Sequence, residues 1–262
     1  MSRREPIGIN VDRVEKTFER RGAVTALAGV SVDIAPGEFF SILGPSGCGK
    51  STLLRCIAGL DAPTMGEVRV GGRKVDAPPE SMGIVFQRDA LLEWRTVLDN
   101  LMLPVDFRRK RRADARPHAM ELLDLFGLKG FEQRYPAELS GGMRQRASIC
   151  RALIDEPALL LMDEPFGALD ALTRDQLNVD LQEMWTSDRK TVVFVTHSIA
   201  EAVFLSDRIA VFTPRPGRIA EIIEVDLPRP RRLSVRGDTR FTDCVSRIRE
   251  MFEGMGLLRE RS

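Results

Sequence analysis

The sequence lacks a long apolar run. Its most hydrophobic stretches, residues 158–162 and 191–195, fall far short of the roughly 18 residues that a membrane-spanning helix needs. The first ten residues carry charge but no apolar segment, so we expect no secretory signal. Four cysteines lie far apart, at positions 48, 56, 150 and 244, without a Cys-x-x-Cys pair. This spacing argues against a disulfide framework or a zinc site, and it is typical of reduced thiols in a cytosol.

The sequence also lacks an excess of charge of either sign. With 39 Lys and Arg against 38 Asp and Glu, the net charge is +1. A chain whose main partner is nucleic acid usually carries a basic footprint, so this balance argues against such a partner. A hydrophobic content of 43% is that of an ordinary globular protein, and 262 residues allow one or two domains.

A glycine-rich loop of the phosphate-binding pattern is the clearest motif that is present. An apolar, strand-like run over residues 38–43 precedes it, and residues 52–60 have helical spacing. Glycines let backbone N–H groups approach an anion, and the helix N-terminus adds partial positive charge. We expect Lys50 to reach the β- and γ-phosphates of a nucleotide, Ser51 to bind Mg²⁺, and the Cys48 thiol to be exposed with a lowered pKa. The loop comprises Gly44, Pro45, Ser46, Gly47, Cys48, Gly49, Lys50, Ser51 and Thr52.

A second apolar run, residues 158–162, ends in two carboxylates, Asp163 and Glu164. Such a continuous run is typical of a central parallel strand that is buried on both faces. We expect Asp163 to hold Mg²⁺, directly or through water, and Glu164 to act as the general base that polarises the attacking water. The alternative is a pair of acids at a solvated strand end, which the phosphate loop elsewhere in the chain disfavours.

Two further polar residues follow short apolar runs where strands are expected to end. Gln87 comes directly after residues 82–86, and His197 follows Thr196 after residues 191–195. Ligands of α/β proteins gather at the carboxyl ends of strands, so Gln87 is placed to sense a γ-phosphate or its metal, and His197 to act in catalysis. A surface glutamine and a structural histidine are the alternatives.

The remaining segments indicate the overall organisation. Helical spacing replaces strand signals over residues 96–135, which indicates a helical insertion between two halves of an α/β core. The basic run 108–112 inside it is interpreted as a solvated helix start or loop, the alternative being a patch that faces anionic lipid. Residues 7–17 and 26–34 predict a small sheet beside the phosphate loop. Phe18, which ends the first of them, is interpreted either as a core aromatic or as a ring on which a purine stacks.

A second glycine motif, Leu139-Ser140-Gly141-Gly142, opens an apolar-periodic helix that reaches Leu153. It offers another helix start ready for an anion, but without a lysine. With this motif the chain resembles, over nearly its whole length, the nucleotide-binding subunit of an ATP-binding cassette (ABC) transporter. The motifs that carry the resemblance are, in order, the phosphate loop, Gln87, the Ser140 motif, Asp163-Glu164, Asp170 and His197.

The resemblance implies the α/β fold of that family. A P-loop NTPase core with a parallel sheet is expected, together with an N-terminal antiparallel β subdomain and a helical insertion. The ATPase domain would span residues 1–213, with its helical subdomain at about 88–155. Residues 214–262 would form a C-terminal tail with a short strand and a helix, whose Leu227–Arg231 segment is Pro- and Arg-rich.

The resemblance also implies that two copies pair head to tail. Each ATP would lie between the phosphate loop of one copy and Ser140, Gly141, Gly142 and Gln145 of the other, with Asp170 in a loop at the dimer contact.

ATP and Mg²⁺ are the implied cofactors. Gln87 would join Ser51 and Asp163 at the metal. Phe18 stands where the family most often has a tyrosine that stacks on adenine, and phenylalanine keeps the ring needed for stacking.

Within the family, residues 87–100 and the Leu-Pro-Arg-Pro-Arg tail segment look like the importers of the nitrate, sulfonate and taurine group. Such a subunit would sit peripherally on the cytoplasmic face of the inner (plasma) membrane. Its expected partners are multi-span permease subunits and, indirectly, an extracytoplasmic solute-binding protein. Trp94 in this stretch is interpreted as a permease contact, with a buried anchor of the helical insertion as the alternative.

Two other classes of function compete with an importer subunit. A soluble ABC ATPase acting on DNA or ribosomes resembles either a cassette split by a long coiled coil or two cassettes in one chain, and the sequence shows neither feature. A GTPase would need a guanine-reading Asn-Lys-x-Asp motif, which is missing, and the Ser140 motif argues against a small-molecule kinase. The sequence does not name the transported solute.

Overall fold

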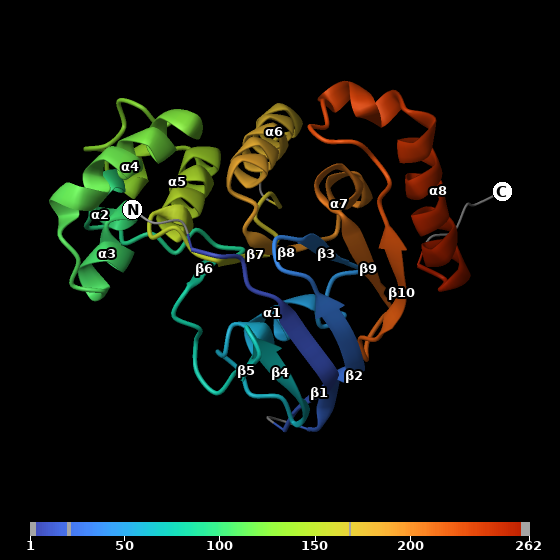
Figure 1. Cartoon of the computed structure of the whole chain (residues 1–262). Helices are drawn as coiled ribbons and strands as arrows, with labels where there is room; N and C mark the ends of the chain where they lie inside the picture. The colour runs from blue at the N-terminus through green and yellow to red at the C-terminus, as the bar shows by residue number, and fades with distance from the viewer. Residues whose placement is uncertain (1–3, 20–21, 168, 258–262) are drawn as a thin grey trace.

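The computed structural model describes residues 4–19, 22–167 and 169–257 (Figure 1). Its centre is a six-stranded sheet with the strand order β10-β9-β3-β8-β7-β6. Every neighbouring pair is parallel except β9 and β10, which are antiparallel. The apolar strands β3, β7 and β8 are buried almost throughout, which confirms the predicted α/β fold with a parallel core. The strands are β3 Phe39–Leu43, β6 Met82–Val85, β7 Leu159–Asp163, β8 Thr191–Thr196, β9 Arg208–Phe212 and β10 Ile219–Glu224.

A separate antiparallel sheet lies beside this core, with the order β2-β1-β4-β5 (Figure 1). Helix α1, Lys50–Ile57, lies between the two sheets and buries Leu53, Leu54 and Ile57 in one apolar cluster with residues of both. The antiparallel sheet therefore holds the start of α1, and with it the loop that precedes the helix. Its strands are β1 Ile9–Phe18, β2 Val24–Ile34, β4 Met65–Val70 and β5 Arg73–Lys74.

Apart from α1, the helices form two groups, one at the left of Figure 1 and the other across its top and right. One group follows β6 and includes the predicted helical insertion, and the members of the other follow β7, β8 and β10. Among residues 4–19, 22–167 and 169–257, no helix is both long and apolar enough to cross a membrane. The first group consists of α2 Val97–Leu101, α3 Leu103–Phe107, α4 Arg112–Leu125 and α5 Gly141–Leu153, with a 3₁₀ turn at Pro136–Glu138. The second consists of α6 Ala171–Asp188, α7 Ile199–Leu205 and α8 Thr239–Gly254, with a 3₁₀ turn at Leu233–Gly237.

The last part of the chain joins the main body through a strand and a helix. Strand β10 pairs with β9, and α8 buries Phe241, Ile248 and Phe252 in the main apolar core. The boundaries 1–213 and 214–262, and the extent of the helical subdomain at about 88–155, stay predictions.

Three residues of the basic run at 108–112 form ion pairs with carboxylates. Arg108 and Lys110 contact the buried Asp155, and Arg112 donates to Asp99 and Asp106 at 2.6 Å each. Ion pairs of this kind occupy the charges that an anionic lipid would need. The structure therefore favours the interpretation as a helix start over the lipid-facing patch.

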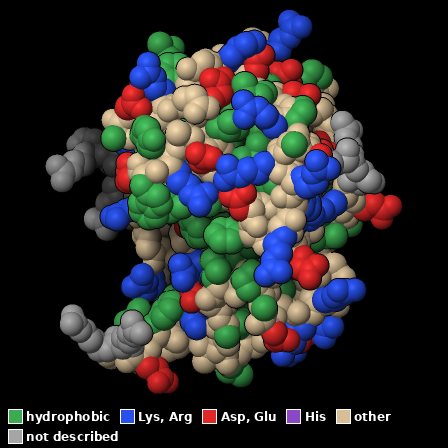
Figure 2. All heavy atoms as spheres, turned by 90° about the vertical axis from the view of Figure 1, so that its left-hand side faces the viewer, with side chains coloured by type: hydrophobic (Ala, Val, Ile, Leu, Met, Phe, Trp, Pro, Cys, Tyr) green, Lys and Arg blue, Asp and Glu red, His purple; other side chains and the backbone are tan. Residues whose placement is uncertain are grey.

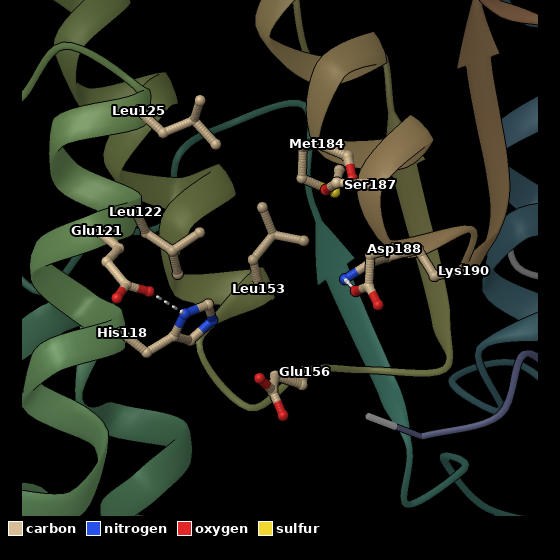
Figure 3. Close-up of a pocket in the computed structure, with 10 residues that line it drawn as sticks. All are labelled: His118, Glu121, Leu122, Leu125, Leu153, Glu156, Met184, Ser187, Asp188 and Lys190. Carbon is tan, nitrogen blue, oxygen red and sulfur yellow. Dashed lines mark hydrogen bonds and ion pairs between the residues drawn. The ribbon is translucent and has the colours of Figure 1, made fainter. Parts of the chain in front are cut away.

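A cavity of about 190 Å³ lies where the ends of α4, α5 and α6 meet (Figure 3). Four apolar side chains and a set of charged ones surround it. At its edge His118 Nδ1 lies 3.5 Å from Glu121 Oε2, and Lys190 Nζ lies 2.7 Å from Asp188 Oδ2. The packing between the helical insertion and the C-terminal end of α6 thus leaves a space here. The lining residues are His118, Glu121, Leu122, Leu125, Leu153, Glu156, Met184, Ser187, Asp188 and Lys190.

Candidate active site

The phosphate loop connects β3 to α1 in the geometry that an anion cradle requires. Gly49, which precedes α1, has φ of 106°, and a Cβ atom there would lie 2.6 Å from Ala26 O, so only glycine fits. Lys50 is 3% exposed, and its Nζ donates to Gly44 O at 2.9 Å and to Pro45 O at 3.0 Å. The ammonium group therefore lies over the loop, where phosphate oxygens can exchange for these carbonyl groups.

Ser51 and Asp163 meet beside this loop. Ser51 Oγ donates to Asp163 Oδ1 at 2.7 Å, which places a hydroxyl and a carboxylate side by side at the end of β7. Burial raises the pKa of Asp163, and the hydrogen bond from Ser51 opposes that shift. In nucleotide sites Mg²⁺ takes one or two protein oxygens together with phosphate oxygens and water, so this pair fits the ion. Gln87, the third predicted metal ligand, instead donates to Glu164.

Glu164 is the point where the predicted catalytic residues converge. Its Oε1 lies 3.5 Å from Lys50 Nζ, and its Oε2 lies 3.3 Å from both Gln87 Nε2 and His197 Nδ1. The backbone of Glu164 has φ of 44°, in the left-handed region that is strained for residues other than glycine. Its N–H donates to Val195 O at 2.9 Å, which fixes this turn to strand β8. The carboxyl ends of β3, β6, β7 and β8 thus supply one site.

The second glycine motif forms a hollow of its own, with a volume of about 400 Å³. Ser140 caps α5 by accepting from Met143 N at 3.3 Å, and Asp170 caps α6 by accepting from Thr173 N at 3.0 Å. Both helix starts open on this hollow, and its lining contains no phosphate-loop residue. It consists of Ser140, Gly141, Gly142, Met143, Arg146, Leu169, Asp170 and Thr173.

Gln145 is a predicted member of the second motif that the structure does not bring to this hollow. It is 7% exposed, and its Nε2 has no hydrogen-bond partner among the described residues. The reason is its position on α5: it lies three and four residues before the buried Ser148 and Ile149, on the helix face turned to the core. Its expected contact with the nucleotide of a second copy stays a prediction, because in the single chain the side chain is buried.

The expectation for Cys48 was wrong. The residue is 1% exposed, and burial raises the pKa of its thiol instead of the helix start lowering it. A Cβ atom on Gly44 would lie 3.1 Å from Cys48 Sγ, so the thiol packs inside the loop. The two positive-φ glycines that flank it, Gly47 and Gly49, turn its side chain inward to the apolar cluster around α1.

We therefore expect Cys48 to resist alkylation in the folded protein, because a buried thiol with a raised pKa supplies little accessible thiolate. Excess maleimide followed by mass spectrometry of the loop peptide should find Cys48 unmodified. The same treatment in denaturant should modify all four cysteines, which serves as the control. Rapid labelling of Cys48 in the folded chain, prevented by MgATP, would contradict the buried position.

Two further residues differ from what sequence alone indicates. Phe18 is 41% exposed and lies at the end of β1 under Lys16 Nζ, 5.1 Å from the ring centroid, so it is not a core aromatic. Its stacking on adenine stays a prediction. Arg215 was missed: its Nε donates to Gly47 O at 3.0 Å. Arg215 comes shortly after β9, which is the parallel neighbour of β3. Because parallel strands end at the same edge of the sheet, this position could have predicted that Arg215 lies near the phosphate loop.

Fold and site together define a P-loop nucleotide hydrolase of the cassette class, because the phosphate loop, the acidic strand end and a second glycine motif at a helix start occur in one chain. Comparison with known proteins supports this. Residues 27–167 match the family model described as ABC transporter. The chain belongs to the ABC transporter family, as an ATP-binding and ATP-hydrolysing component.

Relatives and solved structures extend the comparison. A taurine import ATP-binding protein of Rhizobium johnstonii is 45% identical over 94% of this chain and 94% of its own length. An aliphatic sulfonates import ATP-binding protein of Bacillus cereus is 39% identical over 95% of this chain and 98% of its own. A dimeric ATP-binding cassette, solved in a post-hydrolysis state with ADP and Pi bound, has a TM-score of 0.75 at 35% identity, covering 84% of this chain and 100% of that one.

Proposed function

We propose that this chain hydrolyses ATP to power a membrane importer for a small solute of the sulfonate or taurine type. The observation that carries the hydrolysis is the convergence of Lys50, Gln87 and His197 on the Glu164 carboxylate. The two import proteins named above support the solute class, since this chain matches both over nearly their full lengths. The protein would act at the cytoplasmic face of the inner membrane.

In this proposal each residue has a defined role. Lys50 binds the β- and γ-phosphates, while Ser51 and Asp163 hold Mg²⁺, which neutralises phosphate charge when bound. Water attacks the γ-phosphorus, Glu164 accepts its proton, and the bond to the β–γ bridging oxygen breaks to give ADP and phosphate. Gln87 and His197 hold the Glu164 carboxylate through its Oε2 atom and lie where the γ-phosphate would be sensed.

We also propose that two copies share each ATP. The hollow at Ser140 has helix-start N–H groups suited to an anion, yet no phosphate-loop residue lines it. A second copy facing it head to tail would supply the missing half, with Asp170 at the contact. The dimeric neighbour with ADP and Pi bound supports this arrangement.

The permease is proposed to dock on the face of the helical insertion. A groove of about 350 Å³ lies there between β6, α3 and the end of α5, with Phe86, Leu103 and Phe107 in its lining. Trp94 and Phe107 are 74% and 82% exposed, so the interpretation of Trp94 as a buried anchor was wrong. Figure 2 shows apolar side chains gathered over the middle of this face, with basic ones beside them. A helix with an apolar stripe would fit this surface.

Replacing Trp94 by Ala should spare the isolated chain and weaken assembly with the permease. Because the side chain is exposed, the free energy of unfolding should change by no more than about 0.5 kcal/mol. At an interface, loss of a large aromatic anchor costs at least about 2 kcal/mol. Co-purification with the membrane partner and thermal unfolding measure the two effects. Met65→Ala, on the antiparallel sheet and 62% exposed, is the matched control; equal assembly of both variants would refute the docking site.

The function is tested with the chain co-purified with its membrane partner in lipid vesicles. Taurine, short alkanesulfonates and nitrate, each presented with the solute-binding protein, are screened for stimulated ATP hydrolysis, with an amino acid as the control. We expect stimulation by a sulfonate. Stimulation by DNA or ribosomes, with no response to any membrane partner, would refute the importer.

A further inference from the structure

Helix α7 connects the proposed catalytic site to the C-terminal tail. It begins two residues after His197, and Ser198 caps it by accepting from Glu201 N at 3.4 Å. With seven residues, Ile199–Leu205, it is too short to be stable without tertiary contacts. The position of His197 therefore depends on what holds this helix at each end.

The N-terminal end of α7 is held from β8 and α6. Glu201 accepts from Thr196 Oγ1 at 2.6 Å, and Arg174 Nε lies 3.5 Å from its other carboxylate oxygen. Arg174 also donates to Leu169 O at 2.9 Å, next to the proposed dimer loop. This end is thus fixed by side chains of the catalytic sheet and of α6.

The C-terminal end of α7 is held by Arg231 of the tail. Its Nη1 donates to Val203 O and Phe204 O at 3.0 Å and to Ser206 O at 2.8 Å. These are carbonyl groups that the end of a helix leaves without intrahelical partners, and a cation there also complements the helix dipole. Arg231 is 3% exposed, and burial lowers its pKa to about 10, so it stays charged at neutral pH. Among the residues that the structure describes, the hydrogen bonds of its guanidinium group go to backbone carbonyl groups.

Two further contacts keep Arg231 in place. Gln182 of α6 accepts from Arg231 N at 2.8 Å and donates to Arg231 O at 2.7 Å. Arg229 donates to Leu205 O, the remaining carbonyl at this end, and to Asp207 Oδ1. The Pro- and Arg-rich segment of the tail is therefore a cap that joins α6 to the end of α7.

We infer that Arg231 is a positioning residue for ATP hydrolysis, which acts through α7 on His197. The inference rests on the proposed role of His197. A lysine at 231 would keep the charge but could not reach the three carbonyls at the end of α7 (two within the helix and that of Ser206 after it) and two tail carbonyls at once, because it presents one ammonium in place of a planar fork. The end of α7 would shift, and His197 would lose its fixed distance to Glu164.

Arg231→Lys in the full-length chain, assembled with its membrane partner, tests this. The catalytic constant should fall about ten- to hundredfold, because displacing a group by about 1 Å can cost about 10²-fold. KM for ATP should change little, since no phosphate-loop residue touches Arg231. In a His197→Ala background the same change should have no further effect, as expected for two residues that act as one unit. Arg232→Lys, at the exposed neighbour, is the matched control.

A readout without turnover uses the two histidines. In NMR spectra the His197 imidazole signal should shift or broaden in Arg231→Lys, while the signal of His118 on α4 stays unchanged. If Arg231→Lys does not fold, Gln182→Leu, which frees the main chain of Arg231 but keeps its guanidinium, should move the same signal.

Three results would overturn the inference. One is a normal rate together with an unmoved His197 signal. Another is an equal loss of rate with and without His197. The third is normal ATP hydrolysis by His197→Ala alone, which also refutes the proposed role of His197. An inactive His197→Ala beside a fully active Arg231→Lys refutes only the positioning role.

Discussion

Glu164→Gln should bind ATP, fail to hydrolyse it, and hold two copies of the chain together. Removing the proton acceptor should lower the hydrolysis rate by about 10²- to 10⁴-fold, the usual contribution of a general base. The amide keeps the shape and the hydrogen-bonding capacity toward Gln87 and His197, whose nitrogen atoms lie 3.3 Å from Oε2. It also removes one negative charge beside Lys50, which leaves that cation to the phosphates. Binding should therefore survive while chemistry stops.

The trapped state should appear as a dimer in size-exclusion chromatography with ATP and not with ADP, because only the γ-phosphate reaches both surfaces. Adding Ser140→Arg to the same chain should abolish the shift by filling the opposing hollow. Glu253→Gln, at an exposed position of α8, is the matched control and should behave as the unmodified protein. Normal turnover in Glu164→Gln would remove Glu164 from the mechanism, and ATP binding without dimerisation would refute the two-copy arrangement for the isolated chain.

Lys50→Ala should abolish hydrolysis and also weaken ATP binding, which separates it from Glu164→Gln. A hydrogen bond to a charged group is worth about 1.5–3 kcal/mol, so losing one should raise Kd for ATP by about ten- to 150-fold. Lys50 is almost fully buried over the loop, and a solvent cation would not replace it. Binding is measured with a fluorescent ATP analogue and turnover by phosphate release.

Lys129→Ala is the matched control, because Lys129 is exposed and pairs with Asp124 at the surface. It should leave both measurements unchanged. Turnover near that of the unmodified protein in Lys50→Ala would mean that the loop does not bind the transferred phosphate, whatever its sequence pattern.

The positions of the candidate catalytic residues could be predicted from sequence because one geometric rule governs them. Glu164 and His197 follow the buried strands β7 and β8, Gln87 follows the half-buried edge strand β6, and parallel strands bring their carboxyl ends to one edge of the sheet. The distances of 3.3 Å at Glu164 Oε2 are what that rule leads one to expect. The positive φ of Glu164 has no sequence signal, since nothing in the local sequence specifies the backbone hydrogen bond to Val195 that accompanies it.

Side-chain direction inside irregular segments could not be predicted. The phosphate-loop pattern fixes a backbone path, but whether Cys48 faces solvent or the core depends on the sheet packed beneath it. The burial of Gln145, by contrast, could have been predicted, because the periodicity of helix α5 puts Gln145 on the same face as the buried Ser148 and Ile149. The segment Leu227–Arg231 is recognisable in the sequence, but the burial of Arg231 is not, because a buried arginine normally implies a carboxylate partner, and here backbone carbonyl groups at the end of α7 take that place.

The scarcity of tryptophan has an optical consequence. Trp94 is 74% exposed on the proposed permease face, whereas Trp185 is fully buried, with the guanidinium groups of Arg189 and Arg229 at 4.6 and 4.2 Å from its ring centroid. One indole emits from water and the other from an apolar setting beside cations, so their fluorescence bands are separable. The red-shifted emission of Trp94 should therefore report binding of the proposed permease. The blue-shifted emission of Trp185 should report the contact between Arg229 of the tail and α6.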